Sequence, residues 1–129
     1  MAIVKVHGVK RNILINRDKM SQIIHECMVI KLGLPADKRY HFFHAIDRES
    51  VYYPSDRTDR YTLIEITLFE GRPQDKIKEV IHLILERICD DLDLPKDDVE
   101  VIVYPVPKNS WGLKGLVAQD LPLGYQEND

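Results

Sequence analysis

The sequence has few cysteines, few aromatic residues and no long apolar run. Two of its 129 residues are cysteines, and 8% are aromatic. Cys27 and Cys89 both lie in apolar helical patterns, which predicts two reduced, buried thiols rather than a disulfide. No apolar run approaches the roughly 20 residues of a membrane-spanning helix, and the first residues lack a signal-peptide core. We therefore expect a cytoplasmic protein that has no membrane partner.

Blocks of like charge are absent as well. The net charge of −3 comes from 18 basic and 21 acidic residues that are interspersed along the chain. Interspersed charge is not typical of a nucleic-acid surface or of a basic membrane-binding helix, so we expect no nucleic-acid partner. An apolar fraction of 44% is ordinary for a globular protein, and this length is typical of one compact domain.

The sequence contains no cluster of metal-binding side chains. His41 and His44 would lie on opposite faces of a strand, and His25 and Cys27 would diverge on a helix. We therefore expect neither a metal nor a cofactor.

The second half of the chain repeats the first at an offset of 60 positions, which places Ile3 over Leu63 without a gap. The same offset places LGLPADKRY, from Leu32, over LDLPKDDVE, from Leu92. Apolar matches alone arise easily by chance, whereas a shared L-x-L-P-x-D string at the same offset does not. The sequence therefore predicts two copies of one structural unit.

Each half predicts a strand, an amphipathic helix and a second strand. Apolar and polar residues alternate over AIVKVHGV and TLIEITLF, as in a half-buried strand. Helical spacing follows in each half, at Met20, Ile23, Ile24, Cys27 and Met28 and then at Ile77, Ile81, Ile84, Leu85 and Ile88. The helices should end near Gly33 and Asp93, ahead of Pro35 and Pro95, because proline interrupts the hydrogen-bond ladder. RYHFFHAI and VEVIVYPV are the second strands.

These elements predict an α+β fold made of a tandem βαβ repeat, over about residues 2–46 and 62–106. We expect a four-stranded mixed sheet with two helices on one face, in a single domain of residues 1–129. The other sheet face would then be left open. Small domains commonly bury such a face against another copy, so we expect oligomerisation.

Three motifs in this order resemble the tautomerase superfamily, which includes oxalocrotonate tautomerase and malonate semialdehyde decarboxylase. They are Glu70-Gly71-Arg72 between a strand and a helix, LPADKRY from Leu34, and NSWGLKG from Asn109, which is similar to the family's C-terminal tryptophan-and-glycine hairpin. The resemblance covers nearly the whole chain. It implies the tautomerase fold, a homotrimer whose open sheet faces meet around a central barrel, and a small carboxylate-bearing partner.

The sequence departs from the family pattern in three places. Such proteins use an N-terminal proline as general base or acid, whereas this chain begins Met1-Ala2 and has its first proline at Pro35. Lys38 stands where the decarboxylase-like branch has an aspartate, with Asp37 beside it. Arg11 is displaced by one position from the arginine of the repeated motif.

The resemblance also indicates candidate site residues. If Met1 is removed, the terminal amine of Ala2 is a candidate base or Schiff-base nucleophile, and burial would lower its reference pKa of about 7.7 to 8.0. Asp37 is a second catalytic candidate. Arg72 corresponds to the family's substrate-binding arginine and begins the second helix, and the further substrate-binding candidates are Arg39, Arg11, Trp111 and Tyr104. A structural interpretation stays open, in which Ala2 only begins a strand and Arg72 only pairs with Glu70 or Asp75.

Three functions follow from these candidates. The first is a weak keto–enol tautomerase, an isomerase that acts on a small enol or α-keto carboxylate. The second is a trimeric protein that binds small carboxylates without proline-based catalysis. The third is a related lyase or isomerase reaction that depends on Asp37 or Tyr104 instead of the terminus.

Overall fold

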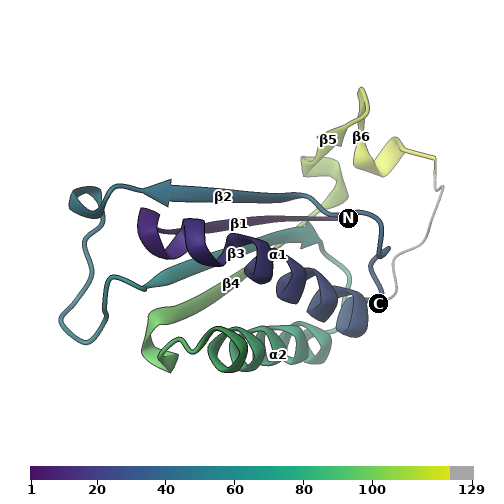
Figure 1. The fold of residues 1–129 in the computed structure, drawn as a ribbon. Helices are drawn as coiled ribbons and strands as arrows, with labels where there is room; N and C mark the ends of the chain where they lie inside the picture. The colour runs from purple at the N-terminus through teal and green to yellow at the C-terminus, as the bar shows by residue number, and fades with distance from the viewer. Residues whose placement is uncertain (123–129) are drawn as a thin grey trace.

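A four-stranded mixed sheet, with both long helices on one face, forms the body of the molecule (Figure 1). The structure, a computed structural model, describes residues 1–122. The first unit comprises β1 (Ala2–Val9), α1 (Lys10–Leu32) and β2 (His41–Ile46), and the second comprises β3 (Thr62–Phe69), α2 (Gln74–Leu92) and β4 (Val99–Val106). A small hairpin of β5 (Gly112–Leu113) and β6 (Leu116–Val117) follows. The predicted α+β fold of repeated βαβ units is confirmed.

The strands run in the order β2-β1-β3-β4, parallel within each unit and antiparallel where the units meet. In the central pair, Ala2 lies opposite Leu68 and Gly8 lies opposite Thr62. The start of β1 is therefore beside the end of β3, and the end of β1 is beside the start of β3. Each end of the sheet thus combines residues from both repeats.

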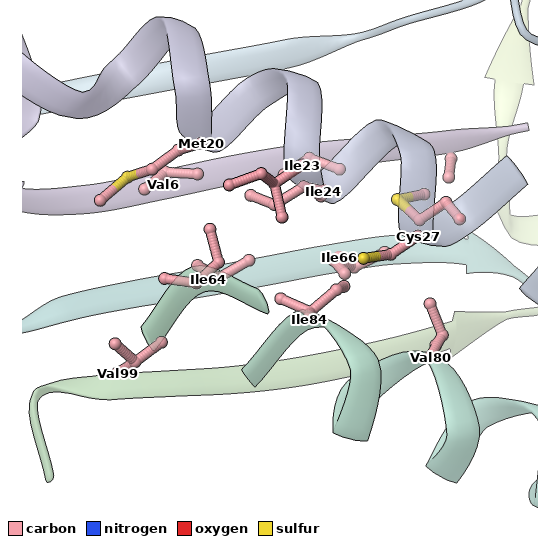
Figure 2. Packing of buried hydrophobic residues seen from close by; sticks show 14 of the residues in the cluster. Val6, Met20, Ile23, Ile24, Cys27, Ile64, Ile66, Val80, Ile84 and Val99 are labelled. Carbon is pink, nitrogen blue, oxygen red and sulfur yellow. The ribbon is translucent and has the colours of Figure 1, made fainter. Parts of the chain in front are cut away.

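One face of each central strand packs against the helices. Val4, Val6, Ile64 and Ile66 are fully buried, as their alternation with polar residues predicted. Side chains from α1 and α2 complete this core, among them Met20, Ile23, Ile24, Cys27, Val80 and Ile84 (Figure 2). Cys27 is buried and Cys89 only half-buried, and both are free thiols.

The two helices end alike and begin differently. Gly33 and Asp93, at equivalent positions of the repeat, both take a left-handed conformation, with φ of 68° and 52°, that turns the chain out of the helix. α1 starts at Lys10 directly after β1, whereas four residues separate the end of β3 from Gln74, where α2 starts. The expectation that Arg72 begins the second helix is therefore wrong, since it lies in the turn that precedes α2.

Neither α1 nor α2 covers the second face of the sheet. Aromatic side chains on that face are exposed, including Phe42 on β2 at 53% and Tyr104 on β4 at 42%. No helix within residues 1–122 combines the length and the apolar character that a membrane crossing requires.

Two isoleucines of α1 give a matched test of the core. Ile24 is fully buried and Ile30 is 65% exposed. We expect Ile24→Ala to lower the free energy of unfolding by about 2 to 5 kcal/mol, because it removes buried methyl groups and leaves a cavity. Ile30→Ala should change it by less than about 0.5 kcal/mol. Urea unfolding followed by circular dichroism at one protein concentration measures both, and equal effects would contradict this packing.

Candidate active site

The amino terminus lies at one end of the sheet, where β1 and β2 begin and β3 and β4 end. Pairing of Ala2 with Leu68 places Met1 next to the turn that follows β3. The backbone N–H of Glu70 donates to the Val106 carbonyl at 2.9 Å, which brings in the end of β4. The Val4 N–H donates to the Tyr40 carbonyl at 2.9 Å, so the segment that leads into β2 runs along β1.

The Met1 amine in this position has an unusual acidity. Its pKa is lowered from the ordinary 8.0 to about 5, first by burial and then by the positive charges of Arg72, Lys108 and Lys38. The amine is therefore almost entirely neutral at pH 7. A neutral amine among cations can accept a proton while the cations attract an anion.

The turn after β3 determines where Arg72 lies. Gly71 has a φ of 122°, a conformation that residues with a Cβ rarely adopt, and it reverses the chain between Glu70 and Arg72. Arg72 Nη1 donates to the Phe69 carbonyl at 3.3 Å, which holds the half-buried guanidinium against the end of β3. In the first repeat the equivalent residues are already helical, so no such turn exists there.

Aromatic and basic side chains complete this end of the sheet. The rings of Trp111 and Phe69 lie 4.6 Å apart between centroids and are tilted by 58°. Lys108 Nζ is 5.4 Å from the centroid of the Phe69 ring. A depression of about 430 Å³ beside them is lined by Glu70, Pro107, Lys108, Asn109 and Gln119.

Comparison with known proteins identifies the family to which the chain belongs. The model of a family described as "tautomerase enzyme" matches residues 38–114. The chain belongs to the tautomerase family. The probable tautomerase YusQ of Bacillus subtilis is 24% identical over 98 residues, which span 72% of this chain and 77% of that protein. The 2-hydroxymuconate tautomerase of Comamonas testosteroni is 32% identical over 57 residues, which span 44% of this chain and 90% of the relative.

Solved structures share the fold of this family member at low sequence identity. Native fused 4-OT superposes with a TM-score of 0.81 at 16% identity, covering 92% of this chain and 98% of its own. FG41 malonate semialdehyde decarboxylase inhibited by 3-bromopropiolate gives a TM-score of 0.77 at 17% identity, covering 91% and 92%. The resemblance inferred from the motifs is thereby confirmed for family and fold.

The structure separates the predicted site residues into groups. Ala2 is buried as the first residue of β1, and Arg72 and Trp111 lie at the same end of the sheet. Asp37 is exposed in a turn, and it is its neighbour Lys38 whose charge acts on the Met1 amine. In the sequence, Lys38 stood out only as a departure from the family pattern.

The remaining candidates have three different positions. Arg39 turns to α1, where Nη1 donates to Ser21 Oγ at 3.2 Å. Tyr104 lies on the open sheet face in the row of Thr67 and Ile3, near the Met1 end of the sheet, whereas Arg11 lies at the opposite end. The sequence did not indicate Lys108, although its position two residues after β4 could have done so, because β4 is parallel to β3 and ends at the same end of the sheet.

A polar cluster between α1 and β2 contains His41, whose pKa is also strongly lowered. The His41 ring is 2.8 Å from Ser21 Oγ through Nδ1, and its centroid is 6.0 Å from that of His25. Burial, followed by the positive charges of His25 and Arg39, lowers the His41 pKa from 6.5 to about 4. His41 is therefore neutral at pH 7 and contributes no charge to the site. Within residues 1–122 no three histidine, cysteine, aspartate or glutamate side chains are arranged to hold a metal ion.

The lowered pKa of His41 predicts a loss of stability in acid. The unfolded chain binds a proton at this ring below about pH 6.5 and the folded chain only below about pH 4, so the free energy of unfolding should fall as the pH drops between these values. His41→Asn keeps an acceptor for Ser21 but cannot titrate, and should flatten that fall. Urea unfolding at a series of pH values measures both proteins, and parallel curves would contradict the assignment.

Proposed function

We propose that this tautomerase interconverts the keto and enol forms of a small carboxylate-bearing substrate, with the terminal amine as the group that moves the proton. The observation that carries the proposal is the lowered pKa of the Met1 amine beside three cations. The names of the curated relatives support the reaction class, since several are tautomerases of 2-hydroxymuconate.

The neutral amine would act first as a base and then as an acid. It takes the proton from the enol hydroxyl, or from the carbon next to the carbonyl in the reverse direction, and returns it to the other atom of the enol system. A primary amine can accept and release a proton as the family's proline does. If Met1 is removed, Ala2 supplies the amine, from the buried start of β1.

Arg72, Lys108 and Lys38 would hold the substrate carboxylate and stabilise the negative charge that develops on the enolate oxygen. Trp111 and Phe69 would cover the apolar part of the substrate. Lys38, in place of the carboxylate of the decarboxylase-like branch, makes this end more positive and favours an acidic substrate. A binding role without turnover is the alternative, because the same cations attract an anion whether or not the amine moves a proton.

We also propose that the chain assembles as a homotrimer through the open sheet face. Phe42 and Tyr104 are exposed on that face, and another copy would bury them. Fused 4-OT, a structural neighbour with a TM-score of 0.80, is described as an asymmetric trimer.

Activity against pH tests the role of the amine. Because only the neutral amine accepts a proton, kcat/KM for 2-hydroxymuconate should rise through about pH 5 and level off near pH 7. Arg72→Ala should move this rise to higher pH, since a cation that lowers the amine pKa is lost, and should lower kcat/KM at pH 7 about 100-fold. Arg17→Ala, at an exposed position of α1, is the control that loses one charge elsewhere.

Chemical blocking separates turnover from binding. Intact mass spectrometry first shows whether Met1 or Ala2 carries the amine. Acetylation of that amine should abolish turnover and leave carboxylate binding measurable by calorimetry. Turnover that survives acetylation would exclude the amine mechanism, and carboxylate binding by unmodified protein without any turnover would favour the binding alternative.

A charge on the open face tests the trimer. Phe42→Glu should convert the assembly to monomers, because a carboxylate would have to be buried between copies. Glu49→Ala, at an exposed position outside the sheet, is the control. Sedimentation velocity measures the mass of each protein, and a monomeric unsubstituted protein would exclude the proposal.

A further inference from the structure

A second depression lies at the opposite end of the sheet, where β1 ends and β3 begins. Its volume is about 290 Å³. Its polar lining comes from the first turns of α1, through Arg11, Asn12 and Asn16, and from the segment before β3, through Asp59 and Arg60. Leu92 and Leu94, at the end of α2, line it together with Ile15. Two guanidinium groups from different elements thus border one partly apolar depression.

The internal repeat relates this depression to the end of the sheet that holds Met1. At the offset of 60 positions, Arg11-Asn12 corresponds to Gly71-Arg72, and Tyr61 corresponds to Met1. The antiparallel pairing of β1 and β3 makes the two ends equivalent by an approximate two-fold rotation. One difference is decisive, because an ordinary peptide bond between Arg60 and Tyr61 stands where the first end has a titratable amine. The second end can attract an anion but has no such group to move a proton.

Hydrogen bonds hold the wall of the depression in place. Asn12, only 6% exposed, donates through Nδ2 to Thr62 Oγ1 at 3.0 Å and to the Arg60 carbonyl at 3.3 Å. Its Oδ1 accepts from Asn16 Nδ2 at 2.8 Å. Arg60 Nη1 donates to the Asp93 carbonyl at 3.1 Å, which ties the guanidinium to the end of α2. Asn12, Asn16 and the guanidinium of Arg60 are therefore positioned before any ligand arrives.

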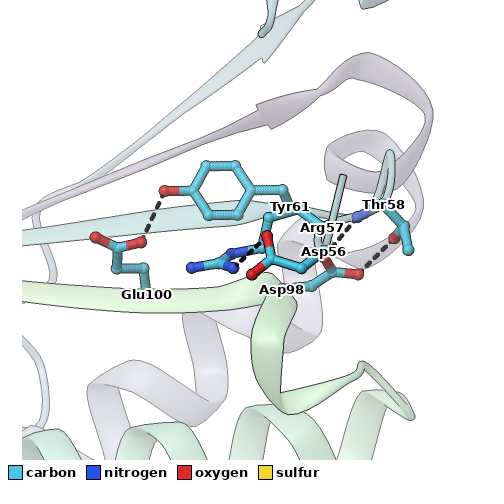
Figure 3. A network of polar contacts seen from close by, with 6 residues as sticks. All are labelled: Asp56, Arg57, Thr58, Tyr61, Asp98 and Glu100. Atoms are coloured by element: carbon cyan, nitrogen blue, oxygen red, sulfur yellow. Dashed lines mark hydrogen bonds and ion pairs between the residues drawn. The ribbon is translucent and has the colours of Figure 1, made fainter. Parts of the chain in front are cut away.

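The segment that carries Arg60 is itself anchored to the second repeat (Figure 3). The Thr58 N–H donates to Asp98 Oδ1 at 2.8 Å, and the Thr58 hydroxyl donates to the other carboxylate oxygen. Tyr61 donates through its hydroxyl to Glu100 Oε1 at 2.9 Å. Contacts on both sides of Arg60 thus fix the backbone from which its side chain extends.

We propose that this depression is a second, non-catalytic binding site for a small monocarboxylate with an apolar body. Arg11 and Arg60 would bind the carboxylate, and Leu92 and Leu94 would pack against the apolar part. Asp59 adds one negative charge to the lining, which disfavours a dianion such as phosphate. The site would bind such monocarboxylates without turning them over.

Two-dimensional ¹H–¹⁵N NMR of the full chain, titrated with 4-methyl-2-oxopentanoate, tests the second site separately from the first. Saturable shifts are expected at the backbone amides of Arg11, Asn12 and Arg60, with a dissociation constant of their own, apart from any shifts at Arg72 and Lys108. Their absence would overturn the proposal. The amides of Arg11, Asn12 and Arg60 report on the second site alone, and those of Arg72 and Lys108 report on the end of the sheet that holds Met1. The proposed function can therefore fail while the second site is confirmed, and the second site can fail while the proposed function is confirmed.

Substitutions identify the groups that bind. Arg11→Gln, at an exposed side chain, should weaken binding at the second site at least about tenfold and leave the shifts at Arg72 and Lys108 in place. Arg17→Gln removes a positive charge from another face of α1 and is the matched control. It should change neither the affinity at the second site nor the shifts at Arg72 and Lys108. Equal affinity of unsubstituted protein and Arg11→Gln would overturn the assignment. Inorganic phosphate at the same ionic strength should not displace the carboxylate, and equal displacement would overturn the proposed monocarboxylate preference.

Discussion

The antiparallel pairing of β1 with β3 is the constraint on which the rest of the structure depends. It joins two βαβ units that are each parallel within themselves, and it places Ala2 opposite Leu68 and Gly8 opposite Thr62. Both helices consequently cover one sheet face, and each end of the sheet receives residues from both repeats. A parallel pairing of the two units would have separated Met1 from the turn that carries Arg72.

Burial and charge act together on the Met1 amine. Desolvation disfavours the ammonium form, and nearby positive charges do so as well, so both lower its pKa. The same positive charges attract a carboxylate, so in the proposed mechanism one arrangement would both prepare the base and recruit the substrate. The lowered pKa of the terminal amine thus depends on the environment of the terminus, which is buried and beside cations, as much as on the residue that carries the amine.

The two ends of the sheet show how a duplicated unit can diverge. The turn at Gly71 adds residues between β3 and α2 and places Arg72 beside the amine, whereas α1 follows β1 directly and holds Arg11 within a helix. The first end has a group that titrates, and the second has a continuous peptide chain. Equivalent positions in sequence thus have different chemistry for reasons of local backbone geometry.

Alternation of apolar residues, helical spacing and the repeat at Leu32 and Leu92 were sufficient to predict the elements, the mixed sheet and the helix-covered face, because these depend on local periodicity and on burying one face of each element. The motif at Arg72, together with LPADKRY and NSWGLKG in the same order, was sufficient to indicate the family. Only the tertiary structure decided which cations meet at the amine, because Lys38 and Lys108 approach it through strand pairing across the sheet and share no spacing with Arg72 in sequence. It likewise decided that Arg11 lies at the other end, since a distance between side chains depends on how strands pair rather than on the residues alone.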